Sequence, residues 1–134
     1  MGPLQGSFGG VRTGELALER TEAGPAVLTI SGEHDLSTAP TLRRRLDSLL
    51  DEGAMTVVDL SPATFIDSSI LGVILDGRRR AEERAIGFAV VHSNGADAVD
   101  RVLEVTGLRT ELPVHARRED AFTAVSGNPG KPPT

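Results

Sequence analysis

The stretch VVDLSPATFIDSSILGVIL, residues 57–75, places an apolar run, a turn and an amphipathic helix in direct succession. The run begins at residue 55 and is almost wholly apolar up to residue 60, as in a short strand that a sheet buries on both faces. A serine and a proline end this strand. From residue 67 onward the apolar residues recur at helical spacing, and either Asp67 or Ser68 can cap the helix. A buried strand that leads into a helix indicates an α/β domain.

The same alternation of strands and helices extends along the rest of the chain. Two β-type runs at residues 15–20 and 26–31 flank the turn-forming segment TEAG, which favours an antiparallel hairpin. Leucines at helical spacing within residues 37–53 predict an amphipathic helix that stops at a glycine. Toward the C-terminus we expect a buried strand at 87–92, a helix that ends at Gly107, a weak edge strand at 110–115 and a last helix at 118–125.

This order of elements predicts one domain. The later strands should pair in parallel through right-handed crossovers, so the expected fold class is α/β: a single domain with a mixed, mostly parallel sheet that starts with an antiparallel hairpin and is flanked by about four helices. The chain has 134 residues, of which 39% are hydrophobic, enough for one core. Its Gly- and Pro-rich ends predict flexible tails at residues 1–12 and 126–134 around a folded domain at 13–125.

The composition argues against several classes of function. The formal net charge is −5, from 14 basic and 19 acidic residues, so nucleic acid is not expected as a partner. Arginine triplets at 43–45 and 78–80 each lie on a predicted helix with acids nearby, which is typical of a solvated helix face. The chain has no cysteine, which rules out disulfides and thiolate sites. No apolar run is long enough to span a membrane and no signal-like segment opens the chain, so we expect a cytoplasmic protein without a membrane partner.

Chemistry in such a fold gathers at the carboxyl ends of the strands. Two acid-bearing loops are predicted there, GEHDLSTA at residues 32–39 and SPATFIDSS at residues 61–69. Both lead directly into helix starts, where backbone N–H groups and the helix dipole favour anionic charge. These two loops are therefore the first place to look for a functional site.

An enzymatic site could use Asp35, Asp59 and Asp67 as a carboxylate cluster, with His34 as a base or metal ligand. The histidines, however, have no metal-ligand spacing, and the chain has neither a Gly-rich phosphate loop nor a nucleophile elbow. Each histidine is better explained as solvated or hydrogen-bonded, and Asp59 as an acceptor of N–H groups in the turn after its strand. We therefore predict no enzymatic activity, no cofactor and no metal site.

A phosphoacceptor needs only an exposed hydroxyl, because the modifying enzyme supplies the catalytic groups. Ser68, at the boundary between loop and helix, fits this description. Phosphorylation there would add about −1.5 to −2 charges beside Asp67 and would repel a partner shaped for a neutral hydroxyl. From spacing alone, however, simple helix capping by Asp67, Ser68 and Ser69 is the favoured interpretation.

From about residue 15 to residue 125, the chain resembles the STAS domains of bacterial anti-sigma factor antagonists. The segment TISGEHDLSTAPTLRRRL is similar to the G-E-x-D loop and first helix of that family, and VVDLSPATFIDSSILGVIL is similar to its strand followed by D-S-S-x-L-G. One position departs from the pattern, because many members have glycine after the two serines where this chain has Ile70. The resemblance implies the STAS fold and a protein of transcription regulation and stress response.

In such a partner-switching system, the resemblance implies that the unphosphorylated protein binds an anti-sigma factor, itself a serine kinase with an ATPase-like fold, and so frees the sigma factor. Phosphorylation by that kinase would end the binding, and a phosphatase would restore it. The matching phosphoacceptor is Ser68. The implied partner surface joins the Asp35 loop to the first turn of the second helix. Its residues are Asp35, Ser37, Thr38, Asp67, Ser69 and Ile70.

Two other interpretations stay open. A domain of the same fold could act as a constitutive scaffold or binding module in a stressosome-like assembly, with Ser68 never phosphorylated. A response-regulator receiver would carry phosphate on Asp59 or Asp67, but it needs an acidic pair after the first strand and a lysine near the last. Here the only lysine is Lys131, in the predicted tail.

Overall fold

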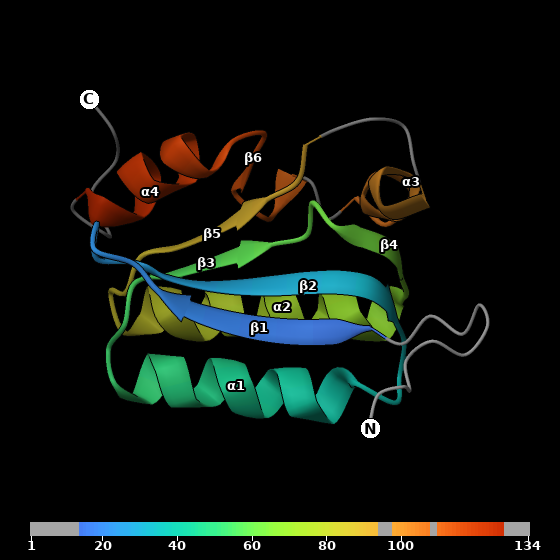
Figure 1. Cartoon of the computed structure of the whole chain (residues 1–134), viewed down its shortest axis with the longest axis horizontal. Helices are drawn as coiled ribbons and strands as arrows, with labels where there is room; N and C mark the ends of the chain where they lie inside the picture. The colour runs from blue at the N-terminus through green and yellow to red at the C-terminus, as the bar shows by residue number, and fades with distance from the viewer. Residues whose placement is uncertain (1–13, 94–97, 108–109, 128–134) are drawn as a thin grey trace, which may run out of the picture.

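Six strands form one mixed sheet within residues 14–93, 98–107 and 110–127, the part of the chain that this computed structural model describes (Figure 1). The strand order is β1-β2-β3-β5-β6, and β4 pairs with β2 outside this path. Only β1 and β2 pair antiparallel, and the remaining pairs are parallel. The strands are β1 Glu15–Arg20, β2 Ala26–His34, β3 Thr56–Asp59, β4 Ala63–Ile66, β5 Phe88–Val91 and β6 Val114–His115.

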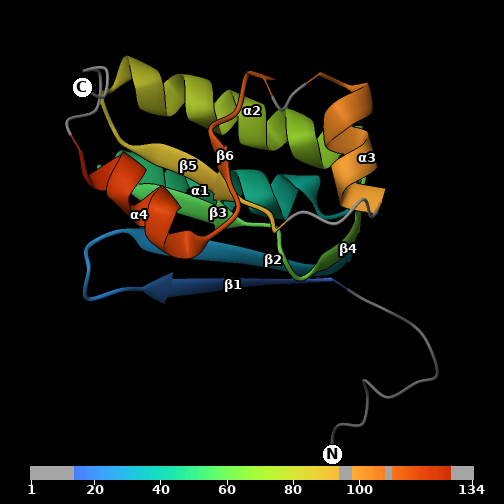
Figure 2. The same ribbon diagram turned by 90° about the horizontal axis from the view of Figure 1, so that it is seen from above.

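Helices cover both faces of this sheet, as Figures 1 and 2 show. On one face lie α1 and α2, on the other lies α4, and α3 lies at the end of the sheet beside β4. The predicted α/β class, the opening hairpin and the number of helices are therefore confirmed for the described residues. The helices are α1 Ala39–Asp51, α2 Ser68–Glu83, α3 Ala98–Val105 and α4 Arg118–Ser126.

The central strands are buried on both faces, as their continuous apolar runs predict. Leu28, Val58 and Val90 lie opposite one another in the register and pack against the leucines of α1 and the apolar face of α2. The residues that precede them in each strand point to the other face, where they pack against Ala121 and Val125 of α4. One sheet therefore separates two apolar clusters, and both must form for the strand ends to be fixed.

The segment between β3 and α2 differs from the prediction. Residues 61–69 were expected as a loop, but residues 63–66 form β4, which pairs with the far end of β2 through Glu33↔Phe65 and His34↔Ile66. For the same reason β2 continues to His34, beyond the residue 31 at which the prediction ended it. The sequence hid this pairing because β4 has only four residues with the two central ones exposed, and because Gly32, at φ +80°, precedes a bulge.

The ends of the helices follow the predicted signals. Asp67 is the N-cap of α2, and Gly53, at φ +76°, supplies the left-handed residue after α1. Gly107 likewise has a positive φ, at the end of α3. Helix α4 reaches Ser126, one residue beyond the predicted domain end, because its last turn continues the apolar face that buries Val125. The predicted tail at 1–12 and residues 128–134 of the other tail lie outside the described residues.

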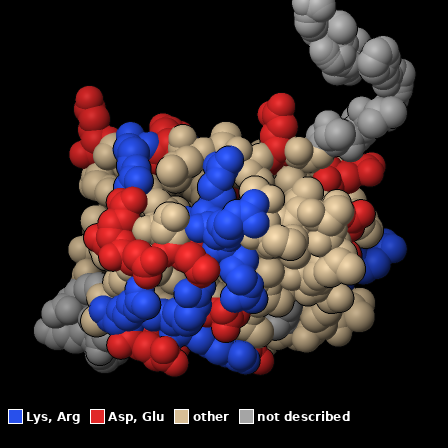
Figure 3. Space-filling view, turned by 90° about the horizontal axis from the view of Figure 1, so that it is seen from below, with Lys and Arg blue, Asp and Glu red and all other residues tan. Residues whose placement is uncertain are grey.

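Three ion pairs join α1 to α2, and each links residues that are 33 positions apart. Arg43 pairs with Asp76 at 2.8 Å, Arg80 pairs with Asp47, and Arg84 pairs with Asp51 at 3.2 Å. We call this set of three pairs the α1–α2 ladder. Figure 3 shows charged side chains of both signs gathered on one part of this face, while another part of it is largely uncharged; in both helices the charged residues begin beyond the first turn.

No helix within the described ranges has the length and apolar character that crossing a membrane requires.

Candidate functional site

The two predicted loops meet at one edge of the molecule because β4 lies beside the end of β2. Asp35 follows β2 directly and Asp67 follows β4 directly, so the parallel pairing of these strands brings both aspartates to the same end of the sheet. Helix α1 starts four residues after Asp35, and α2 starts immediately after Asp67. The candidate site is therefore formed by two neighbouring helix starts.

Asp67 and Asp35 make the same local turn. Asp67 Oδ1 accepts from Ser69 N at 3.0 Å and from Ser69 Oγ at 2.5 Å, and it also accepts from Ile70 N at 3.3 Å. Asp35 Oδ1 accepts from Ser37 N at 2.9 Å and from Ser37 Oγ at 2.6 Å. In both turns the aspartate is ordered by the serine two residues later.

These hydrogen bonds also act on the charge of the first loop. The pKa of the Asp35 carboxyl is lowered from its ordinary value, first by the hydroxyl of Ser37 and then by its N–H group. Asp35 is exposed, so its carboxylate presents a negative charge to solvent beside the start of α1.

Ser68 is the first residue of α2, and its side chain is exposed. The cap of the helix is made by the Asp67 carboxylate and the hydroxyl of Ser69 is bonded to it, whereas the Ser68 hydroxyl makes no hydrogen bond with any described part of the chain. Capping, the favoured interpretation from spacing alone, therefore accounts for Asp67 and Ser69 but leaves the hydroxyl of Ser68 uncommitted.

The buried side chain of His34 holds the Asp35 loop in place. Its side chain is buried, with Nε2 2.9 Å from the carbonyl oxygen of Ser31 and Nδ1 3.0 Å from Thr38 Oγ1. Since a carbonyl oxygen can only accept, Nε2 carries a hydrogen; the Thr38 hydroxyl beside Nδ1 also lies 3.2 Å from the carbonyl oxygen of Asp35, to which it can donate. A hydrogen-bonded histidine was one of the two predicted roles and is confirmed. Its burial was not predicted, because it depends on Gly14, whose backbone packs so closely that a Cβ there would lie 2.2 Å from Nε2.

A pocket of about 390 Å³ opens between the end of β2, the start of α1 and the end of β4. Its walls carry two carboxylates, Glu33 and Asp35, and the ring of Phe65, which is 42% exposed. Leu36 is 70% exposed in the same loop. Large apolar side chains with this exposure are few in the described residues, so the site combines acidic and apolar surface of the kind that proteins use to bind partners. The lining is Gly14, Glu33, His34, Asp35, Ser37, Thr38 and Phe65.

One predicted contact residue does not reach this surface. Ile70 is fully buried in the core between the sheet and the helices, so the prediction that it contacts a partner is wrong. The helical face decides this outcome: Ile70 begins the same apolar stripe as Ile74, whereas Ser68 lies on the opposite side.

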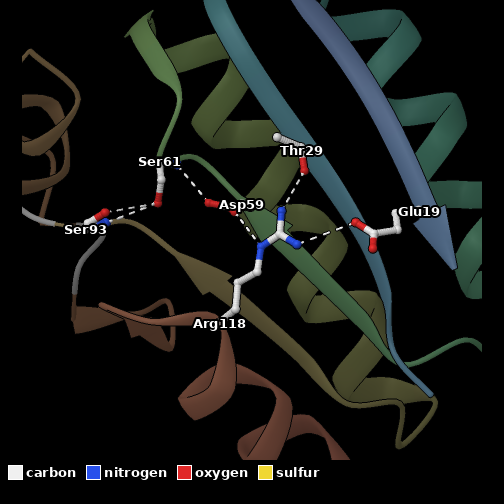
Figure 4. Close-up of polar contacts among 6 residues, drawn as sticks. All are labelled: Glu19, Thr29, Asp59, Ser61, Ser93 and Arg118. Carbon is white, nitrogen blue, oxygen red and sulfur yellow. Dashed lines mark hydrogen bonds and ion pairs between the residues drawn. The ribbon is translucent and has the colours of Figure 1, made fainter. Parts of the chain in front are cut away.

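Asp59 belongs to a separate network on the α4 side of the sheet (Figure 4). One carboxylate oxygen accepts from Ser61 N at 2.9 Å, and the other accepts from Arg118 Nε at 2.9 Å. The same guanidinium contacts Thr29 Oγ1 at 3.3 Å and the carboxylate of Glu19 at 3.5 Å. The predicted role of Asp59 as an acceptor in its own turn is confirmed, and the Arg118 clamp over β1, β2 and β3 is an addition that no local signal indicated.

The three aspartates of the enzymatic hypothesis thus have separate hydrogen-bond partners: Ser37 for Asp35, Ser69 and Ile70 for Asp67, and Ser61 and Arg118 for Asp59. Within the described ranges, no group of three or more histidine and acidic side chains is placed to hold a metal ion. The polar residues at the candidate site hold two helix starts in position beside an exposed hydroxyl, which is the arrangement of a small α/β interaction domain.

Comparison with known proteins identifies the family. The sequence profile described as "Mlab, STAS domain" matches residues 17–114, and the chain belongs to this family. A relative in Bacillus subtilis (strain 168), the anti-sigma-B factor antagonist, is 28% identical over 92 residues, which cover 69% of this chain and 83% of the relative.

Solved structures agree with this assignment. An anti-sigma factor antagonist from Mycobacterium paratuberculosis is 29% identical and matches with a TM-score of 0.73, over 85% of this chain and 95% of the other. The Bacillus cell fate determinant SpoIIAA in its phosphorylated form matches with a TM-score of 0.60 at 23% identity, over 81% of this chain and 97% of the other. The latter likeness shows the shared fold.

Proposed function

We propose that this protein is an anti-sigma factor antagonist that binds an anti-sigma factor and so frees a sigma factor. The binding surface is formed by the Asp35 loop with Ser37 and Thr38, and by the first turn of α2 with Asp67 and Ser69. The observation that carries the proposal is the exposed, uncommitted hydroxyl of Ser68 at the start of α2, next to Asp67 and Ser69, whose side chains are bonded to each other. Membership of the STAS family and the antagonist relatives support it.

Regulation follows from chemistry at the same hydroxyl. The anti-sigma factor, acting as a serine kinase, transfers the γ-phosphoryl group of ATP to Ser68 Oγ, so the hydroxyl loses its proton and ADP leaves. A phosphatase hydrolyses the ester and restores the serine. The phosphate adds about −1.5 to −2 charges. The N–H groups of Ser69 and Ile70 already donate to Asp67, so the new charge gains little compensation from them and faces the partner.

The test is affinity capture from a lysate of the source organism with paired baits, Ser68→Ala and Ser68→Asp, followed by mass spectrometry. The proposal expects an ATPase-like serine kinase that is retained by the alanine bait and lost from the aspartate bait. Ser48 on α1 is an exposed serine away from the candidate site, and Ser48→Asp adds the same charge there as a control. This control bait should retain the kinase.

A constitutive scaffold predicts a different result. Its surface would be the same, because exposed Leu36 and Phe65 suit a permanent contact as well as a reversible one. In that case the alanine and aspartate baits retain the same proteins in equal amount, and incubation with ATP places no phosphate on Ser68. This outcome would replace the switch with a binding module of a larger assembly.

A further inference from the structure

Helix α2 contains two glycines, and only one of them is explained by the fold. Gly77 is buried, and a Cβ at this position would lie 3.2 Å from Leu46 Cδ1 and 3.5 Å from the ring of Phe88. The close packing of α1 and the sheet against α2 therefore accounts for Gly77. Gly72 is exposed, its φ is not positive, and a Cβ there would meet no atom within 4 Å.

Gly72 thus lowers the stability of α2, and no contact within the described chain requires a glycine at this position. Glycine is the least favourable residue in a helix interior after proline, because it loses the most backbone freedom when the helix forms. Neither a left-handed backbone nor a close neighbour requires it here. An alanine at this position would fit and would favour the helix.

The position of Gly72 relates it to the candidate site. It follows Ser68 by four residues, so the two lie one above the other on the same face of α2. Both are exposed and lie in the first turns of α2, where residues 68–75 include no charged side chain. With a short side chain at Ser68 and none at Gly72, about one turn of the helix backbone is accessible beside the Ser68 hydroxyl.

We propose that Gly72 is the point at which the anti-sigma factor comes closest to the backbone of α2, and that this approach brings its bound nucleotide within reach of the Ser68 hydroxyl. The inference rests on the proposed function and names the contact that determines specificity within it. A side chain at residue 72 would hold the partner away from the helix by at least the width of a methyl group. Binding and phosphoryl transfer would both suffer, while the domain itself would become more stable.

The experiment compares wild type, Gly72→Ala and Gly72→Gln in two assays. Urea unfolding measures stability. Binding and phosphorylation are measured with the serine-kinase anti-sigma factors of the source organism, each purified and supplied with labelled ATP. We expect a higher urea midpoint for Gly72→Ala, an affinity at least tenfold lower than wild type, and a larger loss for Gly72→Gln. Glu83→Ala, on the same helix about 16 Å away, should leave the affinity within twofold.

Each other outcome has a distinct meaning. Unchanged binding by a stabilised Gly72→Ala protein overturns the inference and leaves the proposed function standing, provided that Ser68→Asp still abolishes binding. A lower urea midpoint for Gly72→Ala shows that the fold itself needs the glycine and also overturns it. If wild type neither binds nor is phosphorylated by any of the kinases, the proposed function fails first, and the inference falls with it.

Discussion

The two ends of the α1–α2 layer differ in where their polar groups are directed. Beyond the first turns of the helices, from Arg43 and Asp76 onward, arginines and aspartates pair with one another across the helix interface. At the N-terminal ends, the carboxylates of Asp35 and Asp67 bond to the serines of their own turns, while the Ser68 hydroxyl and the side chain of Leu36 face solvent. The charged side chains of the ladder therefore have partners within the chain, whereas the Ser68 hydroxyl and the Leu36 side chain are accessible to another molecule.

The contrast between paired charges in the ladder and exposed groups at the helix starts indicates that the two regions contribute differently to stability and to binding. Surface ion pairs contribute little to stability and are screened by salt. The apolar core that α1 and α2 share holds the two helices against the sheet. We therefore expect a charge at Ser68 to change binding, loss of the hydrogen bonds of His34 or Asp67 to lower stability, and single substitutions in the ladder to have small effects.

The largest expected effect is the loss of binding in Ser68→Asp. A carboxylate at this exposed position faces the partner without compensation from the N–H groups that already bond Asp67. Like charge and desolvation should lower the affinity for the anti-sigma factor at least about 30-fold, or ~2 kcal/mol. Isothermal titration calorimetry measures it, with Ser48→Asp as the matched control. Equal affinities for the two aspartate variants would contradict the proposed role of Ser68.

The next largest effect is a loss of stability when the buried side chain of His34 is removed. In His34→Ala the carbonyl of Ser31 and the hydroxyl of Thr38 lose their buried partner, which should cost about 2 kcal/mol of unfolding free energy. Urea unfolding checks this value. Thr38→Val leaves the Ser31 contact of the histidine intact and removes the contacts of the threonine hydroxyl with His34 and with the exposed carbonyl oxygen of Asp35, so it should cost less, about 1 kcal/mol. A smaller loss in His34→Ala than in Thr38→Val would show that the ring does not hold this loop.

Loss of the α2 cap should have a smaller effect. Asp67→Ala removes the acceptor for Ser69 N and Ile70 N, and we expect a loss of about 1 kcal/mol in unfolding free energy. Asp67→Asn keeps an oxygen acceptor and removes the charge, so it should retain most of that stability. Urea midpoints of the three proteins distinguish a cap from a merely charged residue. Equal losses in both variants would show that charge matters more than capping.

The smallest effect is expected in the ladder. Arg80→Gln removes the contacts with Asp47 and Asp76, and because these groups are partly exposed we expect a loss of about 0.5 kcal/mol that shrinks at high salt. Unfolding in low and high salt measures it, with Arg79→Gln, whose ion pair with Glu111 spans 3.8 Å, as the control. A loss as large as that of His34→Ala would mean that the ladder is a principal source of stability.

The ladder should also give stability a pH dependence with a definite sign. The pKa of Asp76 is lowered, first by its hydrogen bond with Arg43. A carboxyl whose folded-state pKa is depressed adds stability above its unfolded value of about 3.9, and this stability is lost as pH falls through the lower, folded-state value. Unfolding curves at decreasing pH should therefore show less acid sensitivity in Asp76→Asn than in wild type. Parallel curves for the two proteins would argue against this linkage.

Local patterns were sufficient to predict most of the fold. The hairpin, the helices and the buried strands each depend on the periodicity of a single segment, and the Asp67 cap depends on three neighbouring residues. The two acid-bearing loops were expected at one edge because the carboxyl ends of parallel strands share one edge of a sheet, and the parallel pairing of β2 with β4 places them there. What could not be predicted depends on contacts between distant segments: β4 exists because the end of β2 is free to pair with it, and His34 is buried because Gly14 covers its ring.

Ile70 illustrates the same limit within the site. Its place after two serines suggested a surface contact, but the helical phase that turns Ser68 outward turns Ile70 into the core. The Arg118 contact with Asp59 was missed for a different reason, because the two residues are 59 positions apart and each has an ordinary local role at a turn or a helix start.

The Arg118 clamp has a consequence for how the chain is made. Arg118 lies 59 residues after Asp59, so the guanidinium that bonds this carboxylate is supplied only after residue 118 has been synthesised. Until then the Asp59 carboxylate lacks this cation, and the apolar face that α4 covers on β2, β3 and β5 is open. During translation this face of the sheet is therefore completed only with α4, and a chain released before α4 should be recognised by chaperones and proteases as incomplete.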